Sequence, residues 1–270
     1  MCRLLGYLGD PVSLETFLIQ PKHSLVAQSY QPQEMTAGLI NADGFGLGWY
    51  ASPPDQHPYY YRHTLPIWND PNLGELCRYV VSGSFLAYVR SATLGQSLQL
   101  SNCQPFRDRH ILGIHNGFIE NFRQTLYRPL RDCLSDERYQ TLEGTTDSEH
   151  ILALVYDTLA QNTELTLAEA LTQALSRLKA WATSYNIRVS LNIILSDHQS
   201  MVVSRFAYPD PPPSLYWLAV DHPVTGVLVA SEPLDADAQM RSHFGDCWQP
   251  IAADTLLTIN TRQQVETHAL

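Results

Sequence analysis

The chain has 270 residues, a formal net charge of −10 at neutral pH and five cysteines, with a pI near 5.4. This acidity argues against a sequence-independent nucleic-acid binder, which needs a basic face, but it allows a small anionic substrate held by a few arginines. No composition shift or long linker divides the chain. We therefore expect one domain over residues 1–270, or 2–270 once the initiator methionine is removed.

Composition also constrains location and cofactors. The N-terminus shows no basic segment followed by an apolar run, and no apolar run is long enough to span a bilayer. We therefore expect a cytoplasmic protein without a membrane partner. The cysteines are odd in number, widely spaced and free of Cys-x-x-Cys pairs, which predicts neither disulfides nor a zinc site. No cofactor loop or metal-ligand spacing occurs, so we expect neither a cofactor nor a metal.

The first nine residues contain a cysteine, Cys2, and the apolar residues that follow it are predicted to form a buried strand. If Met1 is removed, Cys2 carries a thiol and a free α-amine on the same residue. An α-amine has a pKa of roughly 8, so it can act as a general base near neutral pH. Nucleophile and base then need no separate histidine. From this stretch alone, a chance cysteine at a sheet edge remains the favoured alternative.

The next segments predict a short helix, a loop and a glycine-rich turn. Residues 13–20 have helical spacing and stop at Pro21, and a polar loop is expected from 23 to 36. The segment NADGFGLGWY at 41–50 predicts a turn and a strand whose glycines let another backbone or a ligand approach closely. Since no helix pattern follows, a dinucleotide site is not expected.

A strand is expected at 59–63, a helix after Asp70, and another strand at 84–93. The last of these strands ends in Arg90, followed by small residues. The guanidinium fork of an arginine can bind a carboxylate through two parallel hydrogen bonds. Taken alone, however, a surface arginine in a turn is the favoured interpretation.

A short strand at 111–114 leads into Asn116 and Gly117, and a helical pattern over about 120–134 follows. An asparagine amide together with the next backbone N–H would suit a developing oxyanion. Further on, Thr146 or Asp147 could simply cap the helix predicted from residue 151 to 159. An aspartate near a pocket could instead bind an ammonium group. A second helix is expected at 166–185.

The remaining chain predicts strands at 188–195, 201–206, 215–220, 227–230 and 254–259. Two long helices thus lie between two groups of strands. Hairpin-like spacing favours antiparallel sheets, and we expect a layered α+β sandwich.

Together these motifs resemble the class II glutamine amidotransferases, a family of N-terminal nucleophile (Ntn) hydrolases. The resemblance is carried by MCRLLG at 1–6, NADGFGLGW at 41–49, RSAT at 90–93, HNG at 115–117 and TDSE at 146–149. Each motif is weak alone, but their joint occurrence in the family's order is specific. The resemblance implies a four-layer αββα fold, with two antiparallel sheets packed between helices.

The resemblance also implies roles for single residues. Cys2 would be the nucleophile, and Asn116 with the Gly117 N–H would form the oxyanion hole. The residues implied to bind the substrate are Arg90 for the α-carboxylate, with Thr93 nearby, and Asp147 for the α-ammonium. His115 and His150 are interpreted as structural, because the α-amine already supplies a base. Ser91 and Leu94 depart from the aromatic residue and the histidine that many members carry, which puts closure of this loop over plain glutamine in doubt.

The implied reaction is hydrolysis of a γ-glutamyl amide through a thioester. The opening and the 41–50 segment look like a stand-alone branch that includes the ergothioneine-pathway amidohydrolase, which acts on γ-glutamyl hercynylcysteine sulfoxide. One alternative is a glutaminase-type amidotransferase that supplies ammonia to a separate acceptor enzyme. Another is a catalytically silent relative that binds γ-glutamyl compounds, although such a relative has no need of the nucleophile.

Overall fold

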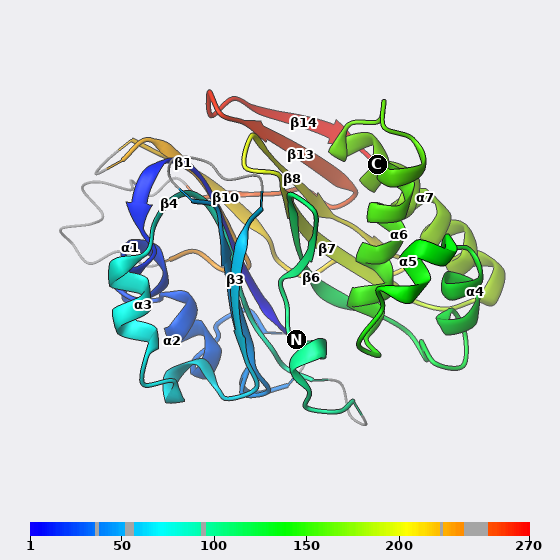
Figure 1. Ribbon diagram of the computed structural model, residues 1–270, viewed down its shortest axis with the longest axis horizontal. Helices are drawn as coiled ribbons and strands as arrows, with labels where there is room; N and C mark the ends of the chain where they lie inside the picture. The colour runs from blue at the N-terminus through cyan, green and yellow to red at the C-terminus, as the bar shows by residue number, and fades with distance from the viewer. Residues whose placement is uncertain (36–37, 52–56, 93–95, 222–223, 235–247) are drawn as a thin grey trace.

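Two antiparallel β-sheets face each other between two groups of helices (Figure 1). The structure is a computed structural model that describes residues 1–35, 38–51, 57–92, 96–221, 224–234 and 248–270. Every strand pair in these ranges is antiparallel. The expected α+β sandwich with αββα layers is therefore confirmed.

The first sheet has the strand order β12-β10-β11-β1-β4-β2-β3. Its strands are β1 (Arg3–Ser13), β2 (Phe45–Trp49), β3 (Tyr59–His63), β4 (Val81–Val89), β10 (Tyr216–Val220), β11 (Gly226–Ala230) and β12 (Gln249–Pro250). The helices on its outer side are α1 (Glu15–Leu18), α2 (Leu25–Tyr30) and α3 (Leu73–Tyr79). The first strand of the chain thus lies inside this sheet, between β4 and β11.

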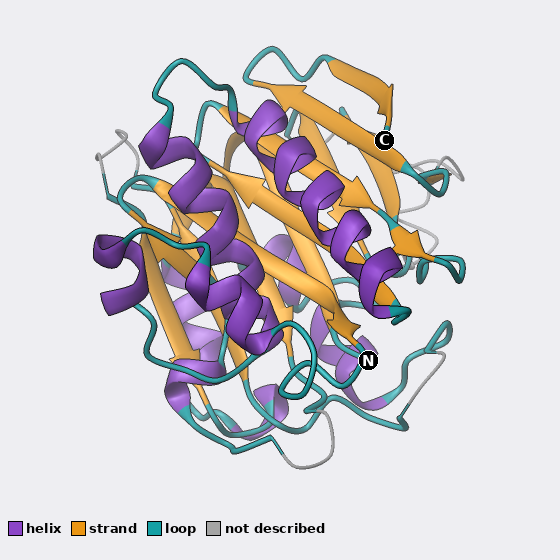
Figure 2. Ribbon diagram, turned by 90° about the vertical axis from the view of Figure 1, so that its right-hand side faces the viewer, coloured by secondary structure: helices purple, strands orange, loops and turns teal. Residues whose placement is uncertain are grey.

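The second sheet has the order β14-β13-β8-β7-β6-β5, and β9 pairs with β7. Its strands are β5 (Phe106–Asp108), β6 (Ile111–Ile119), β7 (Val189–Ser196), β8 (Ser200–Arg205), β9 (Ala207–Tyr208), β13 (Thr255–Asn260) and β14 (Val265–Ala269). The helices on its side of the molecule are α4 (Tyr127–Asp132), α5 (Asp136–Gln140), α6 (Asp147–Gln161) and α7 (Leu167–Tyr185). Figure 2 shows α6 and α7 lying across the outer face of this sheet.

Three layers of apolar side chains hold the sandwich together. One lies under α6 and α7, one lies under α1 to α3, and the third fills the space between the sheets. The middle layer joins Leu4 and Leu86 of the first sheet to Ile114, Ile194 and Met201 of the second. The inner face of β1 is therefore buried from its first residues, and the N-terminal end of the strand is fixed by packing as well as by strand pairing.

Three local expectations were wrong. The polar segment 23–36 contains α2, because Ser24 caps this helix by accepting the Ala27 N–H and Leu25 is buried. The helix expected over 120–134 begins only with α4, because β6 runs on to Ile119 and Asn121 then has a positive φ of 51°. The final strand β14 was missed, because four of its five residues are exposed and it carries little apolar pattern.

No helix in the described ranges is long and apolar enough to cross a membrane.

The glycine-rich strand β2 does approach another backbone closely. A Cβ at Gly46 would overlap the carbonyl oxygen of Gln104, as the sequence predicted for this segment. Gln104 in turn uses its side-chain amide to hold the backbone of His115 on β6. The missing side chain at Gly46 therefore allows β2 to approach the backbone of Gln104, whose side chain binds the strand that carries Asn116.

We expect Gly46→Ala to lower the free energy of unfolding by about 2 kcal/mol or more, because the backbone of Gln104 cannot move aside cheaply. Gly74→Ala is the matched control, since Gly74 lies in α3 and its Cβ would meet nothing within 4 Å. That change should stabilise the protein by about 0.5–1 kcal/mol through helix propensity. Urea unfolding of both variants measures this, and equal midpoints would contradict the proposed close packing.

Candidate active site

A cavity of about 810 Å³ lies at the N-terminus of the chain. Its walls come from the start of β1, the segment after β4, the end of β6 and the start of α6. The residues predicted from the sequence that line it are Cys2, Gly117 and Asp147. Arg90 and Asn116 do not line it: they are only 2% and 1% exposed, and their chain neighbours Ser91 and Gly117 form part of the wall. Thr93 falls outside the described residues. The fold therefore gathers the predicted residues from four separate segments.

The sulfur of Cys2 is held by groups at the end of β4. It lies 2.9 Å from the hydroxyl of Tyr88 and 3.4 Å from the backbone nitrogen of Ser91, which donates to it. Burial raises the pKa of Tyr88 well above its ordinary value, and the neighbouring Cys2 adds to the effect. The phenol therefore stays protonated and can donate a hydrogen bond to the sulfur. Tyr88 was not predicted from the sequence; the available signal was a hydroxyl in an apolar strand, two residues before Arg90.

A buried ion pair fixes the backbone of Cys2. Arg3 Nε lies 2.7 Å from the Glu232 carboxylate, and Arg3 Nη1 donates to the Cys2 carbonyl at 2.9 Å. The same carboxylate accepts bonds from His23 at 2.7 Å and from the N–H groups of Gln33 and Glu34 at 2.8 and 3.1 Å. Burial alone would raise the pKa of Glu232, but these donors and Arg3 outweigh it and lower the pKa to about 2.

The guanidinium of Arg90 is surrounded by oxygen atoms. Its Nη2 donates to the side-chain oxygen of Gln96 at 3.1 Å, and longer contacts of 3.4–3.5 Å reach the carbonyls of Asp43 and Ser97. The carboxylate of Asp43 accepts the Ala92 N–H at 2.7 Å, which holds the segment after β4. Gln96 lines the cavity. A substrate carboxylate that replaced Gln96 could therefore pair with Arg90.

The side chain of Asn116 is buried, yet neither its amide nitrogen nor its oxygen has a hydrogen-bond partner among the described residues. Asn116 pairs with Asn192 across β6 and β7, and its neighbour Gly117 forms part of the cavity wall. A Cβ at Gly117 would overlap the carbonyl oxygen of Ser190, so only glycine fits there. A buried N–H without an acceptor, next to the cavity, is what stabilisation of an oxyanion requires.

Asp147 is the first residue of α6, but it is not the cap of this helix. Thr146 is the cap, since its hydroxyl accepts the Glu149 N–H at 3.2 Å. The carboxylate of Asp147 accepts the Ile119 N–H at 2.8 Å and the Ser148 N–H at 2.9 Å, which ties α6 to the end of β6. Because a carboxylate has about four acceptor positions, Asp147 can also bind an ammonium group in the cavity.

Both histidines near the site are occupied by structural contacts. His115 lies 2.9 Å from the Ser148 hydroxyl and 3.0 Å from the Ser190 carbonyl, and burial lowers its pKa. His150 binds the Thr146 carbonyl and accepts from Arg131, and burial lowers its pKa to about 4. Within the described ranges, no group of three or more His, Cys, Asp or Glu side chains could hold a metal ion.

The class II glutamine amidotransferase family matches residues 1–258, nearly the whole chain, so the protein belongs to this family. It is accordingly an amidohydrolase of the Ntn type. A solved structure of a glutamine aminotransferase class-II domain protein from Silicibacter pomeroyi has the same fold. It gives a TM-score of 0.70 at 25% identity and covers 99% of both chains.

Two kinds of relatives share most of the chain. The yeast protein called "Probable glutamine amidotransferase DUG3" (Saccharomyces cerevisiae) is 28% identical, over 100% of this chain and 84% of its own length. The gamma-glutamyl-hercynylcysteine sulfoxide hydrolase of Mycolicibacterium smegmatis is 30% identical, over 88% of this chain and 89% of its own. The corresponding hydrolase of Mycobacterium tuberculosis H37Rv is 29% identical, with 88% and 87% covered.

We expect Tyr88→Phe to slow alkylation of Cys2 by iodoacetamide about 3- to 10-fold at neutral pH, because the thiolate loses a hydrogen-bond donor. Tyr156→Phe is the matched control: it removes an equally buried hydroxyl, which donates to the Phe106 carbonyl at 3.1 Å. This control should leave the rate unchanged. Mass spectrometry of Cys2 labelling measures both rates, and an equal loss in the two variants would refute a specific role of Tyr88.

Glu232→Gln should lower the free energy of unfolding at pH 7 by about 3–5 kcal/mol, since it leaves Arg3 buried without its counter-charge. Because the pKa of Glu232 is lowered from 4.5 to about 2, the stabilisation is complete above about pH 4.5 and is lost as the pH falls through 2. The difference in the free energy of unfolding between Glu232→Gln and wild type should therefore shrink as the pH falls from about 4.5 to about 2.

Chemical unfolding at several pH values tests this expectation. Glu75→Gln is the control, because it breaks an exposed ion pair. The side chain of Glu75 is 78% exposed and that of its partner Arg78 is 67% exposed. That exposed pair should contribute less than about 1 kcal/mol. A Glu232→Gln protein as stable as the Glu75→Gln protein would show that the buried pair does not hold the N-terminus.

Proposed function

We propose that the protein hydrolyses a γ-glutamyl amide with Cys2 as the nucleophile and releases glutamate. We further propose γ-glutamyl hercynylcysteine sulfoxide, in ergothioneine biosynthesis, as its substrate. The hydrolases of that name among its relatives support this choice. The observation that carries the proposal is the placement of Cys2 in the wall of one large cavity, next to Met1, which also lines a second large cavity.

The second cavity, of about 620 Å³, adjoins the first and shares Met1, Phe118 and Arg188 with it. Because Met1 lines both, its removal would join the two spaces next to Cys2, which lines the first. Plain glutamine needs room only for departing ammonia, whereas a joined space of this size suits a bulky leaving amine. Glu34 and Asp210 line the second cavity, and their carboxylates suit an amine that becomes protonated as it leaves.

In the proposed mechanism, the α-amine that Cys2 gains on loss of Met1 takes the proton of the thiol. The sulfur attacks the γ-carbonyl carbon, and Asn116 with the Gly117 N–H stabilises the resulting oxyanion. The intermediate collapses, the ammonium gives its proton to the leaving amine, and a γ-glutamyl thioester remains. Water then attacks the thioester with the amine again as base, which releases glutamate and restores the thiol.

The environment of the N-terminus supports this use of an α-amine. Burial lowers the pKa of the Met1 amine from its ordinary value, and Cys2 partly opposes the shift. This end of the chain therefore lies in surroundings that favour a neutral amine, which is the form that can accept a proton. Arg90 and Asp147 would bind the carboxylate and the ammonium of the glutamyl group, with Thr93 near Arg90.

A second candidate function is a glutamine amidotransferase that passes ammonia to a separate acceptor enzyme. It is favoured by the match to the yeast protein, which extends over 100% of this chain. The two functions differ in the leaving group. Because ammonia is small, the amidotransferase would need only the first cavity and a path for ammonia.

We expect purified protein to release glutamate at least about 100-fold faster from γ-glutamyl hercynylcysteine sulfoxide than from glutamine, in terms of kcat/KM. The larger substrate would use binding energy from both cavities. Cys2→Ala should abolish release, and Cys133→Ala is the matched control at a partly buried cysteine in another region. Intact mass should show that the active protein lacks Met1.

A preference for glutamine, or activity only with an added acceptor enzyme, would favour the amidotransferase instead. Full activity of Cys2→Ala, or of protein that retains Met1, would refute the proposed nucleophile and base.

A further inference from the structure

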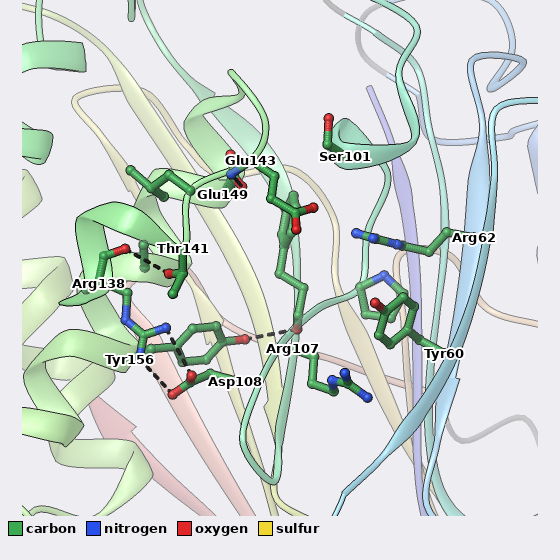
Figure 3. A pocket seen from close by; sticks show the side chains of 14 residues that line it. Tyr60, Arg62, Ser101, Arg107, Asp108, Arg138, Thr141, Glu143, Glu149 and Tyr156 are labelled. Carbon is green, nitrogen blue, oxygen red and sulfur yellow. Dashed lines mark hydrogen bonds and ion pairs between the residues drawn. The ribbon is translucent and has the colours of Figure 1, made fainter.

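A third, smaller cavity of about 260 Å³ lies away from the candidate active site, between β3, β5 and the helices α5 and α6 (Figure 3). The residues that line it and those that line the active-site cavity have no member in common. The segment 143–147 separates the two, because Glu143 faces the small cavity while Thr145 and Asp147 face the large one.

Two arginines of this cavity have no carboxylate partner among the described residues. The guanidinium groups of Arg62 and Arg107 lie 4.7 and 4.8 Å from the centre of the Tyr60 ring, and Figure 3 shows them on either side of this ring. Within the described ranges, Arg62 and Arg107 donate hydrogen bonds only to the carbonyls of Cys103 and Pro58, respectively. The Nε of Arg62 is buried and has no acceptor in the part of the chain that the structure describes.

Most of the acidic groups nearby are already engaged. Asp108 forms a two-point ion pair with Arg138, at 3.0 and 2.9 Å. Glu149 is buried, and its carboxylate accepts the backbone N–H groups of Glu143 and Gly144. Glu143 is different, because its carboxylate points into the opening opposite Arg62 (Figure 3). The two are not close enough to form an ion pair in the described structure, so opposite charges face each other across an open space.

We propose that this cavity binds a small zwitterion of the α-amino acid type. Its carboxylate would bridge Arg62 and Arg107 on the open side of the Tyr60 ring, since both arginines offer unused N–H donors, and its ammonium group would bind Glu143. Leu142, Pro105 and Phe106 supply apolar surface for a short side chain. Because Glu143 repels additional negative charge, ligands with several anionic groups fit this site poorly. The inference does not depend on the proposed reaction at Cys2.

The test compares L-leucine with two molecules that each carry half of its charges, 4-methylpentanoate and 3-methylbutylamine. Titration of the full-length protein by calorimetry or NMR should show saturable binding of leucine, at least about tenfold tighter than that of either half. Arg107→Gln and Glu143→Gln should each weaken leucine binding about tenfold. The exposed controls Arg262→Gln and Glu137→Gln should leave it unchanged.

Asp147→Asn shows which of the two cavities binds leucine, because Asp147 lines the active-site cavity and not the smaller one. Unchanged leucine binding in this variant supports the assignment to the small cavity. The proposal is overturned if leucine shows no saturable binding, if 4-methylpentanoate binds equally well, or if Asp147→Asn weakens binding while Arg107→Gln does not. None of these outcomes bears on glutamate release by Cys2, so the two proposals stand or fall separately.

Discussion

A residue at the end of a chain is normally the least ordered part of a protein, and the candidate active site depends on overcoming this. The start of β1 lies inside a sheet, where Leu4 and Ser231 exchange two hydrogen bonds of 2.9 and 3.0 Å. The Arg3–Glu232 ion pair adds a charge-assisted bond to the Cys2 carbonyl. The thiol therefore has a defined position before any substrate arrives, which lowers the entropy that binding and reaction would otherwise lose.

The packing of the two sheets explains why the remaining groups meet at this point. Tyr88 at the end of β4 belongs to the apolar layer between the sheets, together with Ile114 of β6. Beyond this layer, β6 continues to Asn116 and Gly117, and Asp147 ties the start of α6 to its end. Cys2, Gly117 and Asp147 thus line one cavity from both sheets and a helix, and Asn116 lies next to Gly117. A change that shifts one sheet against the other would misplace all three.

The layered fold and most of the gathered residues could be predicted, because long helices and apolar strands leave periodic patterns and the motifs follow one another in the family's order. Short or irregular elements such as α2 and the 120–126 turns depend on one cap or one positive φ, which sequence patterns do not reveal. Tyr88 and Glu232 escaped prediction for another reason. Each acts through a partner 86 or 229 residues away in the chain, and no local signal connects such pairs.

The unpartnered amide of Asn116 is costly in a fold that satisfies most of its buried groups. A buried polar group without a partner destabilises the folded state by about 1–3 kcal/mol, and Asn192 and Ser190 on the paired strand each leave an oxygen in the same condition. An apolar side chain of similar size at residue 116 would avoid that loss. Stability therefore gives no reason for an amide here. A negatively charged oxygen in the adjoining cavity would supply the missing acceptor only during reaction, which is when stabilisation accelerates chemistry.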